Sequence, residues 1–524
     1  QITKWLCQFT LRELRHTSSN ARKRGCMIRA IVVGGGFGGM ASAIRLSAKG
    51  YRVQIVDRCP RLGGRAQVFE RDGYKFDAGP TVITAPFLFD ELFSLHGRHR
   101  EDYVEFKALD PWYRFQFSDG KIFNYGGDIE DTEAEIARFD PRDVSGYRRL
   151  VAHSEKIFDL GFTELADQPF HKITAMFAQI PALIRLKCYR TVWQMVCAYI
   201  QNSELRQAFS VQPLLVGGNP FDTTSIYGLI HFLERRWGIH FAMGGTGALV
   251  DALAKLMKEL GIEIHLNSTV QEILVEENKA CGVLLEDGNR FEADVVVSDV
   301  DPKHLYKNML QPSQQSWLAR KKTQHHALSM GLFVLYFGTD KIYPDIAHHT
   351  IWLGQRYREL LTEIFKGSSL PEDFSLYLHR PTATDPSFAP EGCDSFYVLA
   401  PVPNLNAGID WATQGAILRN RIIESMSQTM LPDLERHLVT DFFMTPEDFA
   451  HDYLSEGGAG FSVAPLFSQS AWFRYHNKSE GPENLFLVGA GTHPGAGLPG
   501  VVSSAKVLDR LVPDAHHTRN NEAA

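Results

Sequence analysis

The sequence predicts an α/β protein in which a Rossmann-like dinucleotide-binding domain is combined with a mixed α+β substrate domain. Three observations support this prediction. Residues 28–33 form an apolar, β-branched run, residues 34–39 are nearly all glycine, and a helical stretch then leads to a second apolar strand at 51–56. These pieces make a complete β-turn-α-β unit of about thirty residues. The chain of 524 residues is long enough for two or three domains of roughly 100–200 residues.

The glycine-rich turn contains the spacing G-x-G-x-x-G, and each of its glycines has a physical role. Gly34 permits the tight turn, Gly36 lets a pyrophosphate approach the backbone, and Gly39 lets helix and strand pack closely. The start of the helix offers free N–H groups and the positive end of its dipole to the pyrophosphate. Asp57, which follows the second strand, can accept hydrogen bonds from an adenosine ribose. We therefore expect a bound dinucleotide.

The residues after Asp57 indicate which dinucleotide is bound. Segment 58–65, RCPRLGGR, resembles the D-x-x-x-x-x-G-G-R arm of the FAD-binding superfamily that includes amine oxidases and glutathione-reductase-like enzymes. In that superfamily the arm follows the cofactor beyond its adenosine half, and segment 76–81, FDAGPT, continues the pattern where the isoalloxazine ring would lie. Neither 245–247 nor 489–491 completes a second dinucleotide fingerprint. The resemblance therefore implies FAD that is reduced by the substrate, not by a nicotinamide bound on its own domain.

The later part of the chain is expected to return to the same sheet. A helix runs from Gly244 to about Leu260 and is closed by Gly261. The elements expected after it are strands at 262–266, near Val270 and at 293–298, with a hairpin around Asp287-Gly288, and then a strand at 485–488, a glycine-rich loop and a helix from about Val501. Strands that return after such a helix would extend the nucleotide-binding sheet.

One FAD-binding domain is thus expected to be assembled from discontinuous segments. Its segments are 27–111, 241–300 and 481–524, the last including a C-terminal tail. Region 112–240 is expected to be mainly helical, substrate-binding and membrane-associating, and 301–480 to form a mixed substrate-binding domain. Residues 1–26 are strongly basic, and we expect them to be upstream sequence or a disordered leader, with Met27 as the true start.

From about residue 28 to 512 the chain closely resembles the bacterial and fungal phytoene desaturases of the carotenoid/retinoid oxidoreductase family. The most specific blocks are FDAGPTVIT (76–84), LRQAFSVQPLLVGGNPF (205–221), LFVLYFG (332–338), AHHTI (347–351), DFSLYLHRPT (373–382), QSAWFR (469–474) and LVGAGTHPGAGLPGV (487–501). Gly489-Ala490 stands where many relatives outside the desaturases have Gly-Asp, which is typical of this family. Val270 lies where the superfamily commonly places a backbone contact to the adenine. The expected FAD contacts are Gly34, Gly36, Phe37, Gly38, Gly39, Asp57, Arg58, Gly64, Arg65, Gly79, Pro80, Thr81, Val270, Gly489, Gly491, Gly500 and Val501.

The resemblance implies successive dehydrogenation of 15-cis-phytoene to neurosporene or lycopene, with hydride passing to the flavin. The reduced flavin would pass its electrons to oxygen or a membrane quinone. Phytoene is a hydrocarbon, so it is held by apolar burial worth about 25 cal/mol per Å², and the sequence singles out no catalytic residue. Two alternatives stay open. One is a desaturase of another carotenoid, such as diapophytoene or hydroxyneurosporene, and the other is a non-catalytic isoprenoid carrier on the same fold.

Segment 171–200 is a candidate membrane-binding segment, because it mixes apolar and aromatic residues with basic ones and contains no acid. This composition is typical of an interfacial helix pair on anionic lipid, although a core-facing helix with solvated basic residues has the same pattern. A substrate dissolved in the bilayer favours the interfacial interpretation. The uncharged run at 484–505 contains too many glycines and prolines to span a membrane, so we predict no transmembrane segment.

Composition limits the classes of binding partner and indicates the cellular compartment. The formal net charge is −7 with no basic stripe, which argues against nucleic acid. Seven scattered cysteines without a C-x-x-C suit neither a disulfide framework nor a zinc site. The adjacent histidines at 325–326 and 348–349 are expected to point apart, so we predict no metal site. We expect a cytoplasmic protein that lies peripherally on the inner face of the cell membrane.

Overall fold

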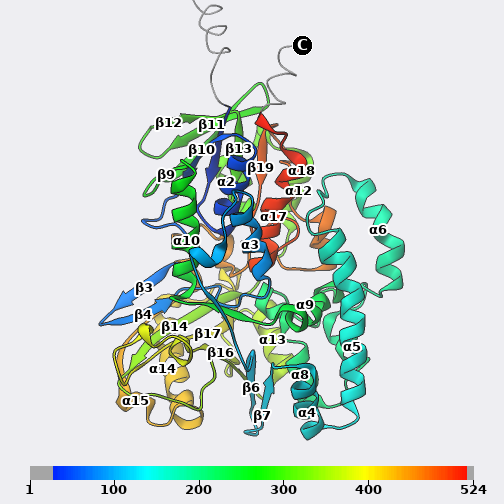
Figure 1. The fold of residues 1–524 in the computed structure, drawn as a ribbon, viewed down its shortest axis with the longest axis vertical. Helices are drawn as coiled ribbons and strands as arrows, with labels where there is room; N and C mark the ends of the chain where they lie inside the picture. Colours follow the sequence, from blue (N-terminus) through cyan, green and yellow to red (C-terminus); the bar gives the residue numbers. More distant parts are fainter. Residues whose placement is uncertain (1–27, 516–524) are drawn as a thin grey trace, which may run out of the picture.

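The computed structural model describes residues 28–515. The expected leader at 1–26 and the expected start at Met27 lie outside the described residues. Figure 1 shows a parallel sheet in the upper half of the molecule and a wider sheet with β14, β16 and β17 in the lower half. Helices α4, α5 and α6 run along one side of both.

The upper sheet is the dinucleotide-binding one, and all of its strand pairs are parallel. Its order is β19-β13-β1-β2-β9. The strands are β1 (Arg29–Val33), β2 (Arg52–Val56), β9 (Glu263–His265), β13 (Val295–Ser298) and β19 (Leu485–Leu487). Three separated stretches of the chain therefore build one sheet, as the sequence predicted.

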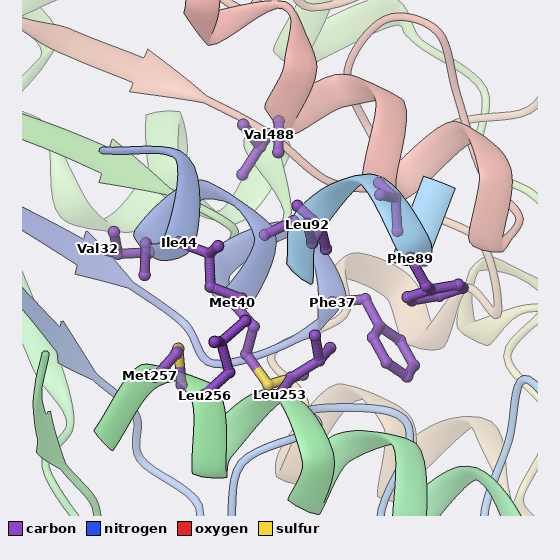
Figure 2. Packing of buried hydrophobic residues seen from close by; sticks show 14 of the residues in the cluster. Val32, Phe37, Met40, Ile44, Phe89, Leu92, Leu253, Leu256, Met257 and Val488 are labelled. Carbon is purple, nitrogen blue, oxygen red and sulfur yellow. The ribbon is translucent and has the colours of Figure 1, made fainter. Parts of the chain in front are cut away.

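Helix α2 (Phe37–Ala48) is enclosed by other elements, so its position is fixed. Figure 2 shows Met40 and Ile44 of α2 packed among side chains of α10 (Gly245–Glu259), including Leu253, and of α3 (Pro86–Ser94), including Leu92. Every residue of α2 from Phe37 to Leu46 is buried. The glycine-rich turn that precedes α2 is consequently held rigidly at the edge of the sheet.

Three expectations for this domain are corrected. Helix α2 begins at Phe37, inside the glycine-rich turn and not after it. Helix α17 (Leu498–Lys506) begins before Val501, because Pro499 fits the first turn of a helix. Only β9 and β13 of the run after α10 join the parallel sheet. Strands β10 (Val270–Glu276), β11 (Lys279–Leu285) and β12 (Arg290–Glu292) form a separate antiparallel sheet. Tight hairpins join antiparallel neighbours, whereas parallel strands need longer crossovers.

The lower sheet has seven strands in the order β18-β14-β17-β16-β15-β6-β7. They are β6 (Tyr113–Phe117), β7 (Ile122–Tyr125), β14 (Gly331–Thr339), β15 (His349–Leu353), β16 (Leu376–His379), β17 (Asp394–Val402) and β18 (Leu438–Met444). All nine residues of β14 are buried, because one face packs against α14 (Trp411–Thr429) and the other faces the cavity described below.

Region 112–240 is mainly helical as expected, but it opens with β6 and β7, which join the lower sheet. Its helices are α4 (Ile129–Phe139), α5 (Asp143–Phe158), α6 (Ile173–Arg185), α7 (Val192–Cys197), α8 (Ser203–Phe209) and α9 (Leu229–Trp237). Two short pairs complete the strands: β3 (Val68–Arg71) with β4 (Tyr74–Asp77), and β5 (Phe106–Ala108) with β8 (His240–Ala242). Further helices are α11 (Pro302–His304), α12 (Trp317–His325), α13 (Tyr357–Lys366), α15 (Leu434–His437), α16 (Pro446–Asp452) and α18 (Leu508–Leu511).

Between residues 28 and 515, none of the helices combines the length and the apolar character needed to cross a bilayer.

Candidate functional site

One cavity of about 570 Å³ connects the two sheets. It begins at the carboxyl ends of β1, β2 and β13, where open parallel sheets bind their ligands. It continues to the face of the lower sheet formed by β14, β15 and β17. A dinucleotide at the upper end and a substrate at the lower end would therefore share one enclosed space.

The glycine-rich turn fits a pyrophosphate. Gly34 has φ +95°, and a Cβ on Gly39 would lie 1.9 Å from the carbonyl oxygen of Gly34. Gly36 is the extended N-cap of α2, and no side chain caps this helix. The Gly39 N–H is bonded to Asp299 Oδ2. The N–H groups that precede it in the first helical turn can face an anionic ligand, which is the arrangement expected for a pyrophosphate.

Asp57 lies at the end of β2, where the ribose of the nucleotide is expected. Its Oδ1 accepts from the Cys59 N–H at 2.7 Å, and its Oδ2 accepts from the Gly35 N–H. Burial raises the pKa of this carboxyl, and the two N–H groups oppose that shift. The turn and the acid therefore position each other before any ligand binds.

The cavity brings together nearly all of the predicted FAD residues. Its lining includes Gly34, Gly36, Phe37, Asp57, Arg58, Gly64, Arg65, Gly79, Pro80, Thr81, Val270, Gly491, Gly500 and Val501. Gly38, Gly39 and Gly489 do not line it. They lie behind the turn, where a Cβ on Gly38 would be 3.2 Å from the backbone nitrogen of Gly489. These glycines allow two segments of backbone to approach each other.

Arg65 has a second role that the sequence did not indicate. Its Nη1 donates to the carbonyl oxygen of Gly460 at 2.7 Å and its Nη2 donates to Ser455 Oγ at 2.7 Å. Arg58 similarly donates to the carbonyl oxygen of His451 at 2.6 Å. The FAD arm is thus fastened to the segment that follows β18.

Asp299 is a site residue that sequence reasoning missed. It directly follows β13, and its Oδ2 accepts from the Gly39 N–H at 2.9 Å. Cβ atoms on Gly36, Gly38 and Gly489 would lie 2.6, 2.5 and 2.3 Å from its carboxylate oxygens, so the carboxylate lies within the glycine cradle. Burial raises the pKa of Asp299 to about 7. The sequence signal that could have identified Asp299 is its position at the carboxyl end of a buried parallel strand.

We expect Asp299 to make FAD binding depend on pH. A pyrophosphate and an ionised carboxylate repel each other, so FAD prefers the protonated form of Asp299. We expect the affinity for FAD to fall as pH rises above about 7, by at most about tenfold per pH unit for linkage to one proton. Quenching of FAD fluorescence between about pH 6 and pH 9 measures this. Asp299→Asn should flatten the dependence, whereas Asp294→Asn, at an exposed residue, should not; equal slopes in all three proteins would contradict the expectation.

The lower part of the cavity is apolar. Its walls are formed by Phe162, Leu165, Leu183, Leu214, Leu229, Ile230, Leu233, Met330, Leu332, Val334, Ile351, Leu353 and Leu399. Such a lining offers a hydrocarbon close contacts and no competing water.

A small polar network interrupts this apolar wall. Thr81 Oγ1 lies 2.7 Å from the Tyr397 hydroxyl and 3.2 Å from the Tyr377 hydroxyl. Separately, the Tyr113 hydroxyl donates to Glu234 Oε1 at 3.3 Å. Polar groups therefore occur at two places on this wall, one at the FAD arm, which carries Thr81, and one at the acid on α9.

Glu234 is the second residue that the sequence did not single out. Among the described residues that line the cavity, Asp57, Asp299 and Asp301 follow strands of the parallel sheet and Asp452 ends α16, whereas Glu234 lies among the apolar walls. It is fully buried, and its Oε2 has no hydrogen-bond partner. Burial raises its pKa to about 8. The sequence signal that could have identified Glu234 is an acidic residue on the apolar face of an amphipathic helix.

The fold and the glycine-rich site define an FAD-dependent oxidoreductase. Residues 37–507 match the family described as flavin containing amine oxidoreductase. The cyclohexylamine oxidase of Brevibacterium oxydans superposes with a TM-score of 0.60 over 95% of this chain and 100% of that chain. At 13% sequence identity this likeness shows the fold alone.

Sequence relatives define the group more closely. A lycopene-forming phytoene desaturase of Pseudescherichia vulneris is 49% identical over 93% of this chain and 99% of its own length. A neurosporene-forming phytoene desaturase of Rhodobacter capsulatus is 41% identical over 95% of this chain and 96% of its own. The chain therefore belongs to the phytoene desaturases of the flavin containing amine oxidoreductase family.

Proposed function

We propose that this protein is an FAD-dependent oxidoreductase of CH–CH groups that desaturates phytoene stepwise to neurosporene or lycopene. The observation that supports this function best is the single cavity that runs from the glycine-rich turn into an apolar chamber. The relatives that are 41–49% identical are phytoene desaturases, which favours phytoene over diapophytoene or hydroxyneurosporene. The intact FAD cradle argues against a non-catalytic isoprenoid carrier.

Substrate binding would depend on burial alone. A polyene chain without polar groups gains about 25 cal/mol for each Å² of apolar surface removed from water. The apolar walls supply this surface, and they also exclude water from the reacting carbons. The number of desaturation steps would depend on how far the product can move along the cavity.

The proton of each desaturation needs an acceptor in the chamber. When bound, FAD supplies the two-electron acceptor for the hydride. Glu234 is positioned to take the proton on Oε2, because this oxygen is buried, has no partner and belongs to a cavity-lining side chain. Tyr113 holds the other oxygen, Oε1, and so orients the carboxylate. Loss of a hydride and a proton from neighbouring carbons leaves one new double bond.

Expression in bacteria that accumulate phytoene tests the function. Extracts should contain neurosporene or lycopene, identified by chromatography and by absorption that moves to longer wavelength with each step. Unchanged phytoene in cells that contain the folded, FAD-loaded protein would contradict the proposal. The acceptor that reoxidises the flavin is either oxygen or a membrane quinone. It is identified by comparing desaturation in aerobic membranes with desaturation in anaerobic membranes supplemented with quinone.

A peripheral position on the inner face of the cell membrane would bring this enzyme to its substrate. Helix α6 supports it, since only Met176 of this helix is buried, whereas α7 packs its apolar residues into the core. Phe177 and Ile184 of α6 are 59% and 60% exposed.

The inner side of α6 contributes Met176 and Leu183 to the cavity lining. In Figure 1, α6 lies at the outer edge of the molecule. A lipid substrate could therefore pass from bilayer to cavity beside α6.

Charge on the outer side of α6 should release the protein from lipid. The double variant Phe177→Glu/Ile184→Glu is expected to bind anionic vesicles at least about tenfold more weakly, because each buried apolar side chain is worth about 1.5–3 kcal/mol. Cosedimentation with vesicles measures the bound fraction. Ile417→Glu, at an exposed apolar residue of α14, is the matched control and should bind normally. Equal binding of all three proteins would contradict the membrane role of α6.

A further inference from the structure

Three buried histidines meet behind the wall of the cavity. His348 directly precedes β15, His349 begins that strand, and His379 ends β16, where it pairs with His349. One ring nitrogen from each lies within 4.8 Å of the others. The expectation that His348 and His349 point apart is therefore wrong. His348 lies outside the strand, so the alternation of side chains along a strand does not apply to it.

Each histidine has one ring nitrogen facing an oxygen, which leaves another nitrogen free. His348 Nδ1 lies 2.7 Å from Thr384 Oγ1, and His349 Nδ1 lies 2.7 Å from the Tyr377 hydroxyl. The Nε2 atoms of both rings are buried without a partner. Metal-binding histidines show this division, in which one nitrogen contacts an oxygen and the other binds the ion.

His379 repeats the pattern with a carboxylate. Its Nε2 lies 3.8 Å from Asp77 Oδ2, and neither atom has a hydrogen-bond partner. Its Nδ1 is also buried without a partner. A small rotation would let Asp77 accept from His379 Nε2–H and leave Nδ1 for an ion. Buried polar atoms are rarely left unsatisfied, and this cluster contains several in contact with one another.

From this geometry we propose that His348, His349 and His379 bind one divalent transition-metal ion of the zinc type, with Asp77 supporting His379. Imidazole nitrogens suit zinc and its neighbours, and hard ions such as magnesium prefer oxygen. Zn–N bonds of about 2.0–2.1 Å in a tetrahedron place the nitrogens about 3.3 Å apart, so the rings would close slightly from their present separation. The fourth position would be taken by a water molecule.

The surroundings are compatible with a buried cation. The nearby cation Arg380 is paired with Asp394 at 3.0 Å, which offsets its repulsion. The Asp77 carboxyl lies 3.8 Å from His379 Nε2, where it can accept a proton from that ring.

The ion would have a positioning role for the FAD side of the cavity. Asp77 ends β4 and lies two residues before the arm residues Gly79, Pro80 and Thr81. Tyr377, which contacts His349, also contacts Thr81. A metal at the cluster would therefore fasten β15 and β16 to the FAD arm.

Metal analysis of the full-length, FAD-loaded protein tests the proposal. We expect about one zinc per chain after exposure to zinc and desalting, and X-ray absorption that shows only nitrogen and oxygen neighbours at about 2.0 Å. A chelator should lower the melting temperature, and zinc should restore it. Cobalt substitution of the native protein should give the visible spectrum of a tetrahedral site, a readout that needs no variant to fold.

Variants locate the ion. His379→Gln should lose the metal, whereas His326→Gln, at a partly buried histidine packed on Tyr475 outside the cluster, should retain it. Less than about one-tenth equivalent of metal in folded protein that binds FAD would overturn the proposal. Equal metal content in both variants would do the same, because the ion would then lie elsewhere. Phytoene desaturation by a metal-free protein would leave the proposed function intact.

Discussion

Replacing Glu234 with glutamine is expected to lower kcat for desaturation by about 10²–10⁴-fold, the usual contribution of a positioned acid or base. Glutamine keeps the size of the side chain and its contact with Tyr113 but cannot accept the proton. FAD binding should not change, because Glu234 lies on the substrate side of the cavity. Tyr113→Phe, which removes only the hydrogen bond, should have a much smaller effect.

The pH profile distinguishes a proton acceptor from a packing residue. Only the ionised carboxylate accepts a proton, so kcat/KM of the native protein should rise about tenfold per pH unit and level off above about pH 8. The slope should disappear in Glu234→Gln. A variant that retains more than half of the native kcat, or a native profile without this rise, would refute the assignment.

The same pKa affects stability. Burial raises the folded-state pKa of Glu234 to about 8 from the ordinary value of 4.5 for a glutamate side chain. The folded state therefore holds this proton more tightly, and stability is lost as pH rises through that interval. Glu234→Gln should melt at the same temperature as the native protein near pH 4.5 and at a higher one near pH 9. A variant that is merely damaged would melt lower at both.

Gly39→Ala should abolish FAD binding. The added Cβ would lie 1.9 Å from the Gly34 carbonyl oxygen, which is backbone, and the enclosed helix α2 leaves neither segment room to move. We expect at least a hundredfold loss of FAD affinity, or protein that fails to fold, because this overlap exceeds what small core shifts absorb at about 1–3 kcal/mol. Flavin absorbance of the purified protein and its thermal melt report the result.

Gly120→Ala is the control for backbone conformation alone. Gly120 has φ +83°, and nothing lies within 4 Å of its Cβ position. Gly120→Ala should lower the free energy of unfolding by about 1 kcal/mol and leave FAD binding unchanged. A Gly39→Ala protein that binds FAD as well as the Gly120→Ala protein would show that the close approach of turn and helix is unnecessary.

The parts of the site that the sequence predicted are local in the chain. The turn at Gly34, Gly36 and Gly39 and the acid at Asp57 belong to one β-turn-α-β unit, so spacing alone indicates their roles. The parallel sheet could also be predicted, because its later strands have turn signals and apolar runs of their own. The separate sheet β10–β12 was missed because an apolar run does not show which neighbour it pairs with.

The other site residues depend on tertiary packing. Glu234 and Tyr113 are more than a hundred residues apart, and no pattern in either segment indicates that they meet. The three histidines come from two strands, and their convergence depends on the register between β15 and β16. Asp299 has no motif of its own, and it acquires its high pKa only through burial in the folded chain.

The most direct test of a flavin facing an apolar, phytoene-binding cavity is an anaerobic single turnover. FAD-loaded protein is mixed with vesicles that contain phytoene, and the flavin and carotenoid absorbances are recorded together. Bleaching of the flavin with formation of one new double bond per FAD is the expected result. Flavin that stays oxidised in the presence of phytoene, yet is bleached by dithionite, would contradict it.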